Sequence, residues 1–339
     1  MKKLLPLVLI FIMACQPDKT PENQVDFDRT VFLQSYADDF IRPAYQSLKE
    51  ELVELSNAIS NRKEAQAQWK EVYFAFLKVT PYNFGPAEED VLVKSLTEEI
   101  ATFPVDITLI QEKIQKNNFQ FEDFRRDSRG LLTLEYLLFN DEAWNLNGRE
   151  EYAQKCLEDI LERVSEVDSR WENYKNEFIL NDGTSAGSST SALYNEFVKS
   201  FEGLKNFKIG LPLGLRPGQT SAVQSNVEAR FSGYSLDFAK QHFETLVSIW
   251  NGSPQKGFKA YLNSVEGGEA LILSAEEQIQ AVQGAFQACD SSDFSESNLD
   301  QNPNLIILHT ELQKLTRFFK SDMSSLLGIA ITYSSGDGD

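Results

Sequence analysis

The sequence contains two histidines, His242 and His309, and imidazole is the side chain best suited to bind a transition metal or to transfer a proton. Neither stands in a His-Glu-x-x-His or His-x-x-Glu pattern, which would place two ligands on one helical face. His309 follows the apolar run 305–308 and is interpreted as a structural residue. Glu244 lies two residues after His242, on a different helical face. The sequence also contains no G-x-S-x-G elbow, phosphate-binding loop or dinucleotide fingerprint, so no common motif assigns an enzyme class.

The N-terminus carries a chemical signal of another kind, a cysteine directly after a predicted signal peptide. A positively charged start precedes the apolar run 4–13, and a small-residue cleavage site ends at Cys15. This pattern resembles a bacterial lipoprotein signal, in which the cysteine is acylated and becomes the new N-terminus. The apolar run is shorter than the roughly 20 residues that a bilayer-spanning helix needs. We therefore expect residues 1–14 to be removed and Cys15 to be lipidated. Gln16, in place of the aspartate that retains lipoproteins at the inner membrane, favours the outer membrane.

The charge of the chain restricts its partners. The 339 residues include 51 acidic and 32 basic side chains, which gives a net charge of −19. Removal of the signal peptide, with its two lysines, makes the protein more negative still. Such a protein is repelled by nucleic acid and by anionic lipid headgroups. We expect no nucleic-acid partner, and we expect membrane attachment to come from several acyl chains, because one alone binds only marginally.

Hydrophobic periodicity predicts the elements that must position any site. Apolar residues recur at steps of three and four through most of the chain. The clearest stripe consists of Ala153, Cys156, Ile160, Val164, Val167, Trp171, Tyr174 and Phe178. Alternation with a period of two is scarce, so we expect an all-α protein built from long amphipathic helices. Pro43 should either kink its helix or mark the start of it.

Length and composition predict two helical bundles. Residues 15–26 are polar, contain two prolines, and are interpreted as a flexible tether between lipid and body. The Gly- and Ser-rich segment 181–191 is the predicted linker, so the expected bundles span 27–182 and 183–339. Cys156 and Cys289 both fall on apolar helical stripes. We interpret them as separate buried thiols, although export to an oxidising compartment permits a disulfide.

Several short blocks together resemble the imelysin-like family. They are residues 41–45, 83–87, 130–139, 208–214, 227–235 and 327–330. The resemblance covers nearly all of the mature chain, and the order and spacing of the blocks carry it. It implies an envelope-associated protein of two helical-bundle domains, with a proposed metallopeptidase activity and a link to the uptake of iron or other metals. The family site lies near the domain interface, around a G-x-H-x-x-E segment.

The sequence departs from this pattern at one position. Gly130 and Glu135 occupy the expected places, but Leu132 stands where the family has histidine. Residues three apart share a helical face, and leucine has no lone pair to donate, so Glu135 alone is a poor ligand set for a transition metal. Activation of water for peptide hydrolysis then loses its basis. Two interpretations of Glu135 stay open: a buried carboxylate paired with Arg230 or another base, or part of a ligand site.

The leading hypothesis from the sequence is an outer-membrane-anchored, non-catalytic binding lipoprotein of an uptake system. An interdomain cleft would hold a complex of iron or zinc, or a small polar ligand, near Glu135, Glu228, Arg230 and Ser232. One alternative is a metallopeptidase of the imelysin type that recruits its ligands from elsewhere in the chain. Another is a structural or adaptor module that binds a second envelope protein. Nothing in the sequence separates the binding protein from the adaptor.

Overall fold

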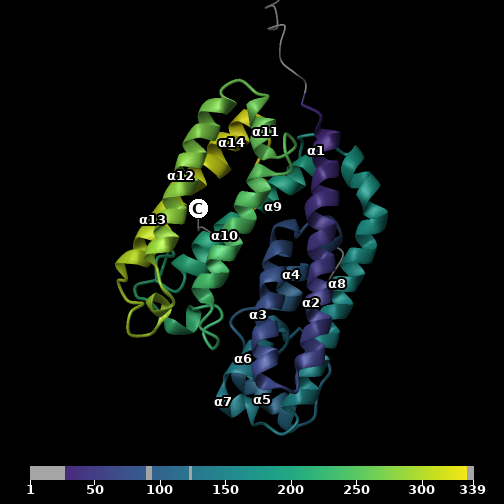
Figure 1. Ribbon diagram of the computed structural model, residues 1–339, viewed down its shortest axis with the longest axis vertical. Helices are drawn as coiled ribbons and strands as arrows, with labels where there is room; N and C mark the ends of the chain where they lie inside the picture. Colours follow the sequence, from purple (N-terminus) through teal and green to yellow (C-terminus); the bar gives the residue numbers. More distant parts are fainter. Residues whose placement is uncertain (1–26, 89–93, 122–123, 334–339) are drawn as a thin grey trace, which may run out of the picture.

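A computed structural model describes residues 27–88, 94–121 and 124–333, and every regular element within them is helical (Figure 1). The predicted all-α fold is confirmed. The signal peptide, Cys15 and the tether lie outside the described residues.

The helices form two groups that lie side by side (Figure 1). The first group contains α1 (Arg29–Tyr36), α2 (Arg42–Ala58), α3 (Arg62–Val79), α4 (Leu96–Ala101), α5 (Ile107–Gln115), α6 (Leu131–Phe139), α7 (Asp141–Trp144) and α8 (Arg149–Leu180). The second contains α9 (Ser189–Gly203), α10 (Ser235–Asn251), α11 (Phe258–Asn263), α12 (Gly268–Ala288), α13 (Pro303–Thr316) and α14 (Met323–Leu327). Three π-helical segments join or extend these helices, at Ala37–Ile41, Leu204–Gly210 and Arg317–Asp322.

The longest helix, α8, follows the predicted apolar stripe. Seven of the eight stripe residues are buried, and Tyr174 is half-buried against Trp171 and Phe178. Phe84, from the turn region after α3, packs on Trp171 at a ring-centroid distance of 5.7 Å. Removal of such large apolar surfaces from water supplies the main force that holds the helices together.

Pro43 lies in the first turn of α2 and has no backbone N–H to donate. The segment before it, Ala37–Ile41, is π-helical, and the N–H of Arg42 donates to the carbonyl of Ala37, so the chain passes from α1 to α2 without a loop. Pro43 therefore follows a change from π-helix to α-helix within a continuous helical stretch.

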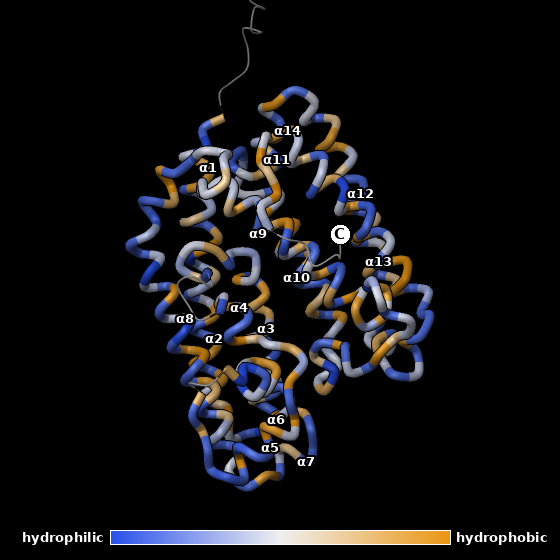
Figure 2. Tube along the Cα trace, turned by 180° about the vertical axis from the view of Figure 1, so that it is seen from behind, coloured by the Kyte–Doolittle hydropathy of each residue, from blue (hydrophilic) through white to orange (hydrophobic). Residues whose placement is uncertain are grey.

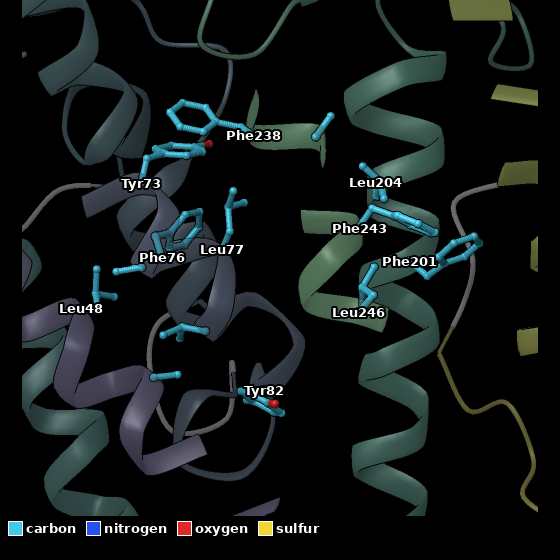
Figure 3. Close-up of a cluster of buried hydrophobic side chains, with 14 of the residues drawn as sticks. Leu48, Tyr73, Phe76, Leu77, Tyr82, Phe201, Leu204, Phe238, Phe243 and Leu246 are labelled. Atoms are coloured by element: carbon cyan, nitrogen blue, oxygen red, sulfur yellow. The ribbon is translucent and has the colours of Figure 1, made fainter. Parts of the chain in front are cut away.

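The two groups meet where α10 packs along α3. Phe238 of α10 stacks on Tyr73 at 4.2 Å and contacts the rings of Trp69 and Phe74. Figure 3 shows Phe238 above Tyr73, with Leu77 and Phe76 below and with Leu204, Phe243 and Leu246 on the facing helices. The junction between the groups is therefore a continuous apolar core.

Helix α1 contacts both groups. It packs on α8, while Phe32 lies 5.2 Å from the ring of Phe258 and Tyr36 donates a hydrogen bond of 2.5 Å to the carbonyl of Ile249. The first residues of the described chain are thus tied to helices some 220 positions away. The proposed division into bundles 27–182 and 183–339 stays a prediction.

The predicted linker 181–191 is partly wrong. Ser188 caps α9, and Ser189, Thr190 and Ser191 form its first turn, where all three are buried. Small side chains at these positions allow the helix to pack closely against its neighbours. The same small polar residues, judged by composition alone, indicate a loop. The two remaining cysteines are unpaired, with Cys156 buried and Cys289 half-buried.

None of the described helices is both long and apolar enough to cross a bilayer. Figure 2 shows hydrophilic and hydrophobic residues interleaved along each helix. This is the pattern of helices that bury one face and expose the other.

Candidate functional site

The segment that carries the candidate site begins at a glycine whose backbone conformation only glycine adopts readily. Gly130 has a φ of +87°, and a Cβ at this position would lie 2.5 Å from the carbonyl oxygen of Ile100. Helix α6 starts at the next residue. A left-handed turn packed on the end of α4 therefore sets the direction in which α6 leaves.

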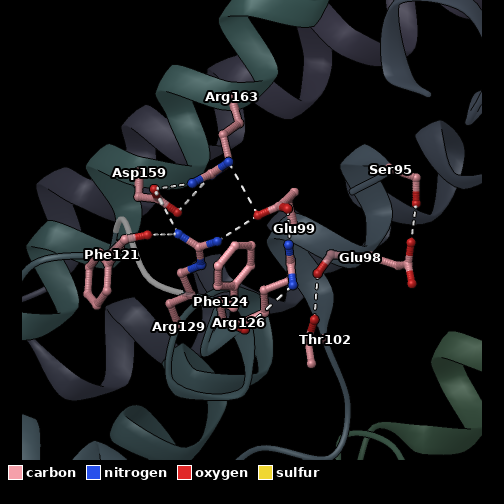
Figure 4. A network of polar contacts seen from close by, with 10 residues as sticks. All are labelled: Ser95, Glu98, Glu99, Thr102, Phe121, Phe124, Arg126, Arg129, Asp159 and Arg163. Atoms are coloured by element: carbon pink, nitrogen blue, oxygen red, sulfur yellow. Dashed lines mark hydrogen bonds and ion pairs between the residues drawn. The ribbon is translucent and has the colours of Figure 1, made fainter. Parts of the chain in front are cut away.

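An ion network fixes the residues just before this turn (Figure 4). The carboxylate of Glu99, only 1% exposed, contacts three guanidiniums: Arg126 at 2.8 Å, Arg129 at 2.6 Å and Arg163 at 3.3 Å. Asp159 of α8 pairs with Arg163 at 3.0 Å. Because Arg129 adjoins Gly130, the network ties the start of α6 to α4 and α8 and makes the position of α6 rigid.

Helix α6 places a carboxylate where its neighbours are apolar. Leu132 is buried in the core, and Glu135, one turn later, is 3% exposed. The backbone N–H of Ser232 donates a hydrogen bond of 2.7 Å to Oε1 of Glu135. Burial raises the pKa of Glu135 to about 7, although the hydrogen bonds from the segment of Ser232 and Phe231 oppose the shift. This carboxyl group therefore keeps its proton to a higher pH than an exposed glutamate does.

A second carboxylate, Glu228, lies in the same region and belongs to the second half of the chain. The hydroxyl of Tyr73 donates to Oε1 of Glu228 at 2.5 Å, and the ammonium of Lys208 pairs with Oε2. The negative charge of Glu228 also contributes to the raised pKa of Glu135. Burial, and then Glu228, raise the pKa of Tyr73 well above its usual value. Tyr73 is therefore a neutral hydrogen-bond donor.

The four residues predicted to share a site differ in whether they contact Glu135. Ser232 contacts Glu135 directly, and Glu228 is coupled to it through charge. Arg230, predicted as the partner of Glu135, instead has its guanidinium 4.6 Å from the ring of Phe231. Among the described residues no ion pair joins Arg230 to Glu135, so that prediction is wrong. A backbone N–H takes the place of the expected base.

Tyr73 and Lys208 are members of this cluster that the sequence did not single out for a site. Both contact Glu228, Tyr73 from 155 residues away and Lys208 from 20 residues away. Tyr73 lies on the apolar side of α3, so hydrophobic periodicity predicts a core residue there. Lys208 lies in a π-helical segment, which no periodic pattern in the sequence predicts. We refer to Tyr73, Glu135, Lys208, Glu228 and Ser232 as the junction cluster.

The two histidines are used elsewhere. His242 is buried on α10, with Nε2 2.8 Å from Oγ of Ser200, and its Nδ1 has no hydrogen-bond partner. Burial, reinforced by the charge of Lys208, lowers its pKa well below the usual value, so the imidazole is neutral. His309 is half-buried beside Gly210, and burial lowers its pKa to about 4.

The sequence profile of one protein family, described as imelysin, matches residues 33–317. The chain belongs to the imelysin family. Its fold is similar to that of an imelysin-like protein from Psychrobacter arcticum 273-4, with a TM-score of 0.74 and 18% identity over 90% of this chain and 97% of that one. It is also similar to a protein from Parabacteroides distasonis ATCC 8503, named as a candidate iron-regulated protein A precursor. That match has a TM-score of 0.74 and 16% identity over 91% of this chain and 96% of the other. No curated protein matches the sequence at a significant level.

Membership of the imelysin family raises the question of whether the junction cluster fits a metal. Within residues 27–88, 94–121 and 124–333, no group of three or more His, Cys, Asp or Glu side chains is arranged to hold one. Glu135, Glu228 and Tyr73 offer oxygen atoms only, and Lys208 already neutralises one carboxylate. Catalytic zinc takes three protein ligands, with imidazole in most sites. The residues of the junction cluster therefore do not fit a catalytic zinc centre.

Proposed function

We propose that this imelysin-family protein is a non-catalytic binding protein of the cell envelope that takes part in metal uptake. Its cargo would be a cationic metal complex, held at the junction cluster between the two groups of helices. The observation that carries the proposal is the pair of carboxylates, Glu135 and Glu228, which come from the two halves of the chain, with the charge of Glu228 contributing to the raised pKa of Glu135.

The state of the two carboxylates suits a site that exchanges cations. The raised pKa of Glu135 lets it keep its proton to a higher pH than an exposed glutamate does, and Glu228 pairs with the ammonium of Lys208. A positively charged ligand that entered the cluster would replace both, since buried carboxylates bind whichever cation neutralises them. The site is thus neutral when empty of cargo, which lowers the cost of burying two acids.

Oxygen donors select the class of cargo. Carboxylates and hydroxyl groups suit hard cations, whereas imidazole suits zinc and other transition metals. A ferric complex that brings most of its own ligands needs only two or three oxygen contacts from the protein. The name of the Parabacteroides protein refers to iron regulation of that protein, and it agrees with iron as the first cargo to test.

Titration calorimetry of the full chain in detergent micelles tests this proposal. Ferrioxamine B, a ferric complex with a net positive charge at neutral pH, should bind, and Glu135→Ala and Glu228→Ala should each weaken the binding at least tenfold. Glu142→Gln is the matched control, because Glu142 is an exposed acid one helix further on. Flat titrations with ferrioxamine B, zinc and manganese would refute metal binding. Cleavage of casein that a chelator abolishes would instead support the peptidase alternative.

The anchoring of the protein is a separate proposal that rests on the sequence. Acylation of Cys15 would hold the protein at the outer membrane, with residues 15–26 as the tether. Fractionation of cells that express Cys15→Ser should show the protein released from the membrane fraction. A variant that stays in that fraction would contradict lipidation.

A further inference from the structure

A second hollow between the two groups of helices lies apart from the junction cluster. It has a volume of about 360 Å³ and is open to solvent. Residues that line it include Asp39, Pro43, Lys78, Tyr82, Thr245 and Ile249. We refer to it as the α2–α10 groove, because α2 and the π-helical segment before it form one wall and α10 forms the other. Pockets of this size between helices commonly bind small molecules.

The base of the groove contains a polar group without a partner. Tyr82 is 2% exposed, and its hydroxyl makes no hydrogen bond within the described part of the chain. Figure 3 labels Tyr82 among the side chains buried between the two groups. Tyr82 lines the groove, so its hydroxyl can bond there to water or to a polar group of a ligand.

Opposite charges stand toward the two ends of the groove. Lys70 of α3 pairs with Asp237 at the start of α10, and Phe74 meets Phe238, so α3 and α10 run in the same direction. Lys78 therefore lies two turns beyond the level of Asp237. Asp39 accepts a hydrogen bond of 2.5 Å from Ser253, just beyond the end of α10. At a rise of 1.5 Å per residue, the backbone level of Lys78 and the end of α10, beside Asp39, are separated along the axis of α10 by roughly 9 Å.

The two charges are also available for a ligand. Lys78 makes no ion pair or hydrogen bond with its side chain in the described residues, unlike Lys70 on the same helix. Asp39 belongs to the π-helical segment Ala37–Ile41, a distortion that is frequent at functional sites. Glu244 also lines the groove, but its carboxylate accepts a hydrogen bond from Gln283 of α12.

We propose that the α2–α10 groove binds a di- or tripeptide with free termini, its carboxylate at Lys78 and its ammonium at Asp39. An extended chain spans roughly 3.3–3.6 Å per residue, so two or three residues match the separation of the two charges. The hydroxyl of Tyr82 bonds to the peptide backbone between the termini. Apolar residues such as Pro43 and Ile249 tolerate different side chains, because apolar contacts carry little directional requirement.

Calorimetric titration of the full chain in detergent micelles with trialanine and dialanine tests the proposal. Trialanine or dialanine should bind, and N-acetyl-trialanine amide, which lacks both terminal charges, should bind at least tenfold more weakly. Lys78→Gln and Asp39→Asn should each weaken binding of the free peptide at least tenfold, and Tyr82→Phe should weaken it severalfold. Both charged residues are exposed, so these two variants should fold normally, which far-ultraviolet circular dichroism will show.

Lys240→Gln is the matched control, since Lys240 is an exposed lysine of α10 that does not line the groove. Its affinity for trialanine should equal that of the unmodified protein. Flat titrations with both free peptides would overturn the proposal. Binding that Lys78→Gln and Asp39→Asn leave unchanged would overturn it as well. Neither result bears on metal binding at the junction cluster, which has its own variants.

Discussion

The carboxylate of Glu135 accepts a hydrogen bond of 2.7 Å from the backbone N–H of Ser232, 97 residues further along the chain. This bond joins α6 of the first group to the segment that leads into α10 of the second. A buried carboxyl group whose pKa is about 7 therefore lies at the contact between the two halves. Its protonation and the stability of the contact are linked.

The first prediction concerns the pH dependence of stability. In the unfolded chain the pKa of Glu135 has its ordinary value of 4.5, whereas burial in the folded protein raises it to about 7. The folded state therefore holds the proton more tightly, and the free energy of unfolding falls as pH rises from 4.5 through 7. Glu135→Gln cannot ionise, so it should remove about 3 kcal/mol of this decline.

Denaturant unfolding of both proteins at pH 4.5 and pH 8 measures this effect. The free energy of unfolding of Glu135→Gln, relative to that of the unmodified protein, should be higher at pH 8 than at pH 4.5. Glu142→Gln serves as the control, since it removes an exposed acid and should leave the pH dependence unchanged. Parallel pH profiles for the unmodified protein and Glu135→Gln would show that Glu135 does not titrate in this range.

The second prediction concerns the turn before α6. Gly130→Ala should lower the free energy of unfolding by about 1–3 kcal/mol or more, because it combines a disfavoured positive φ with a Cβ that would overlap the carbonyl of Ile100. Gly284→Ala should instead raise stability by about 0.5–1 kcal/mol, since Gly284 is an exposed position inside α12 with open space around it. Thermal unfolding of the two variants should show shifts of opposite sign.

The fold was predictable because helix periodicity is a local property of the sequence. The stripe from Ala153 to Phe178 needed only the spacing of apolar residues, and it became the buried face of α8. The segment 189–191 was misassigned because small polar residues favour loops on average. Here tertiary packing buries them in the first turn of a helix, which the local sequence cannot predict.

The site was predictable only in part, because contacts across the junction depend on how two groups of helices pack. Glu135 and Ser232 belong to blocks that the family resemblance marked, and they touch. Arg230 lies two residues before Ser232, but the direction of its side chain toward Phe231 follows from an irregular backbone. The role of Tyr73 depends on Glu228, 155 residues away, and no spacing rule connects them.

The third prediction concerns the ion network of Figure 4. Glu99→Gln leaves three guanidiniums without their shared carboxylate in a buried setting, so it should cost about 3–5 kcal/mol of stability. The adjacent Glu98 is exposed, and Glu98→Gln should change stability by less than about 0.5 kcal/mol. Equal unfolding midpoints for the two variants would contradict a structural role for Glu99.

The fourth prediction places a histidine at position 132, where the sequence resemblance leads us to expect one. Leu132→His introduces an imidazole into the core one turn from Glu135, and without metal it should lower the free energy of unfolding by about 1–3 kcal/mol, the cost of burying a polar group. Leu132→Met keeps the position apolar and should cost less than about 1.5 kcal/mol. The introduced imidazole shares a helical face with Glu135, so the two side chains together offer the nitrogen and oxygen donors that zinc accepts.

Zinc should therefore raise the thermal midpoint of Leu132→His, because a ligand that binds only the folded state stabilises it. The same concentration of zinc should leave the unmodified protein and Leu132→Met unchanged, since neither has an imidazole beside Glu135. A zinc-dependent shift in all three proteins would mean that the metal binds elsewhere. A shift in none would mean that Glu135, fixed by Ser232, cannot turn toward residue 132.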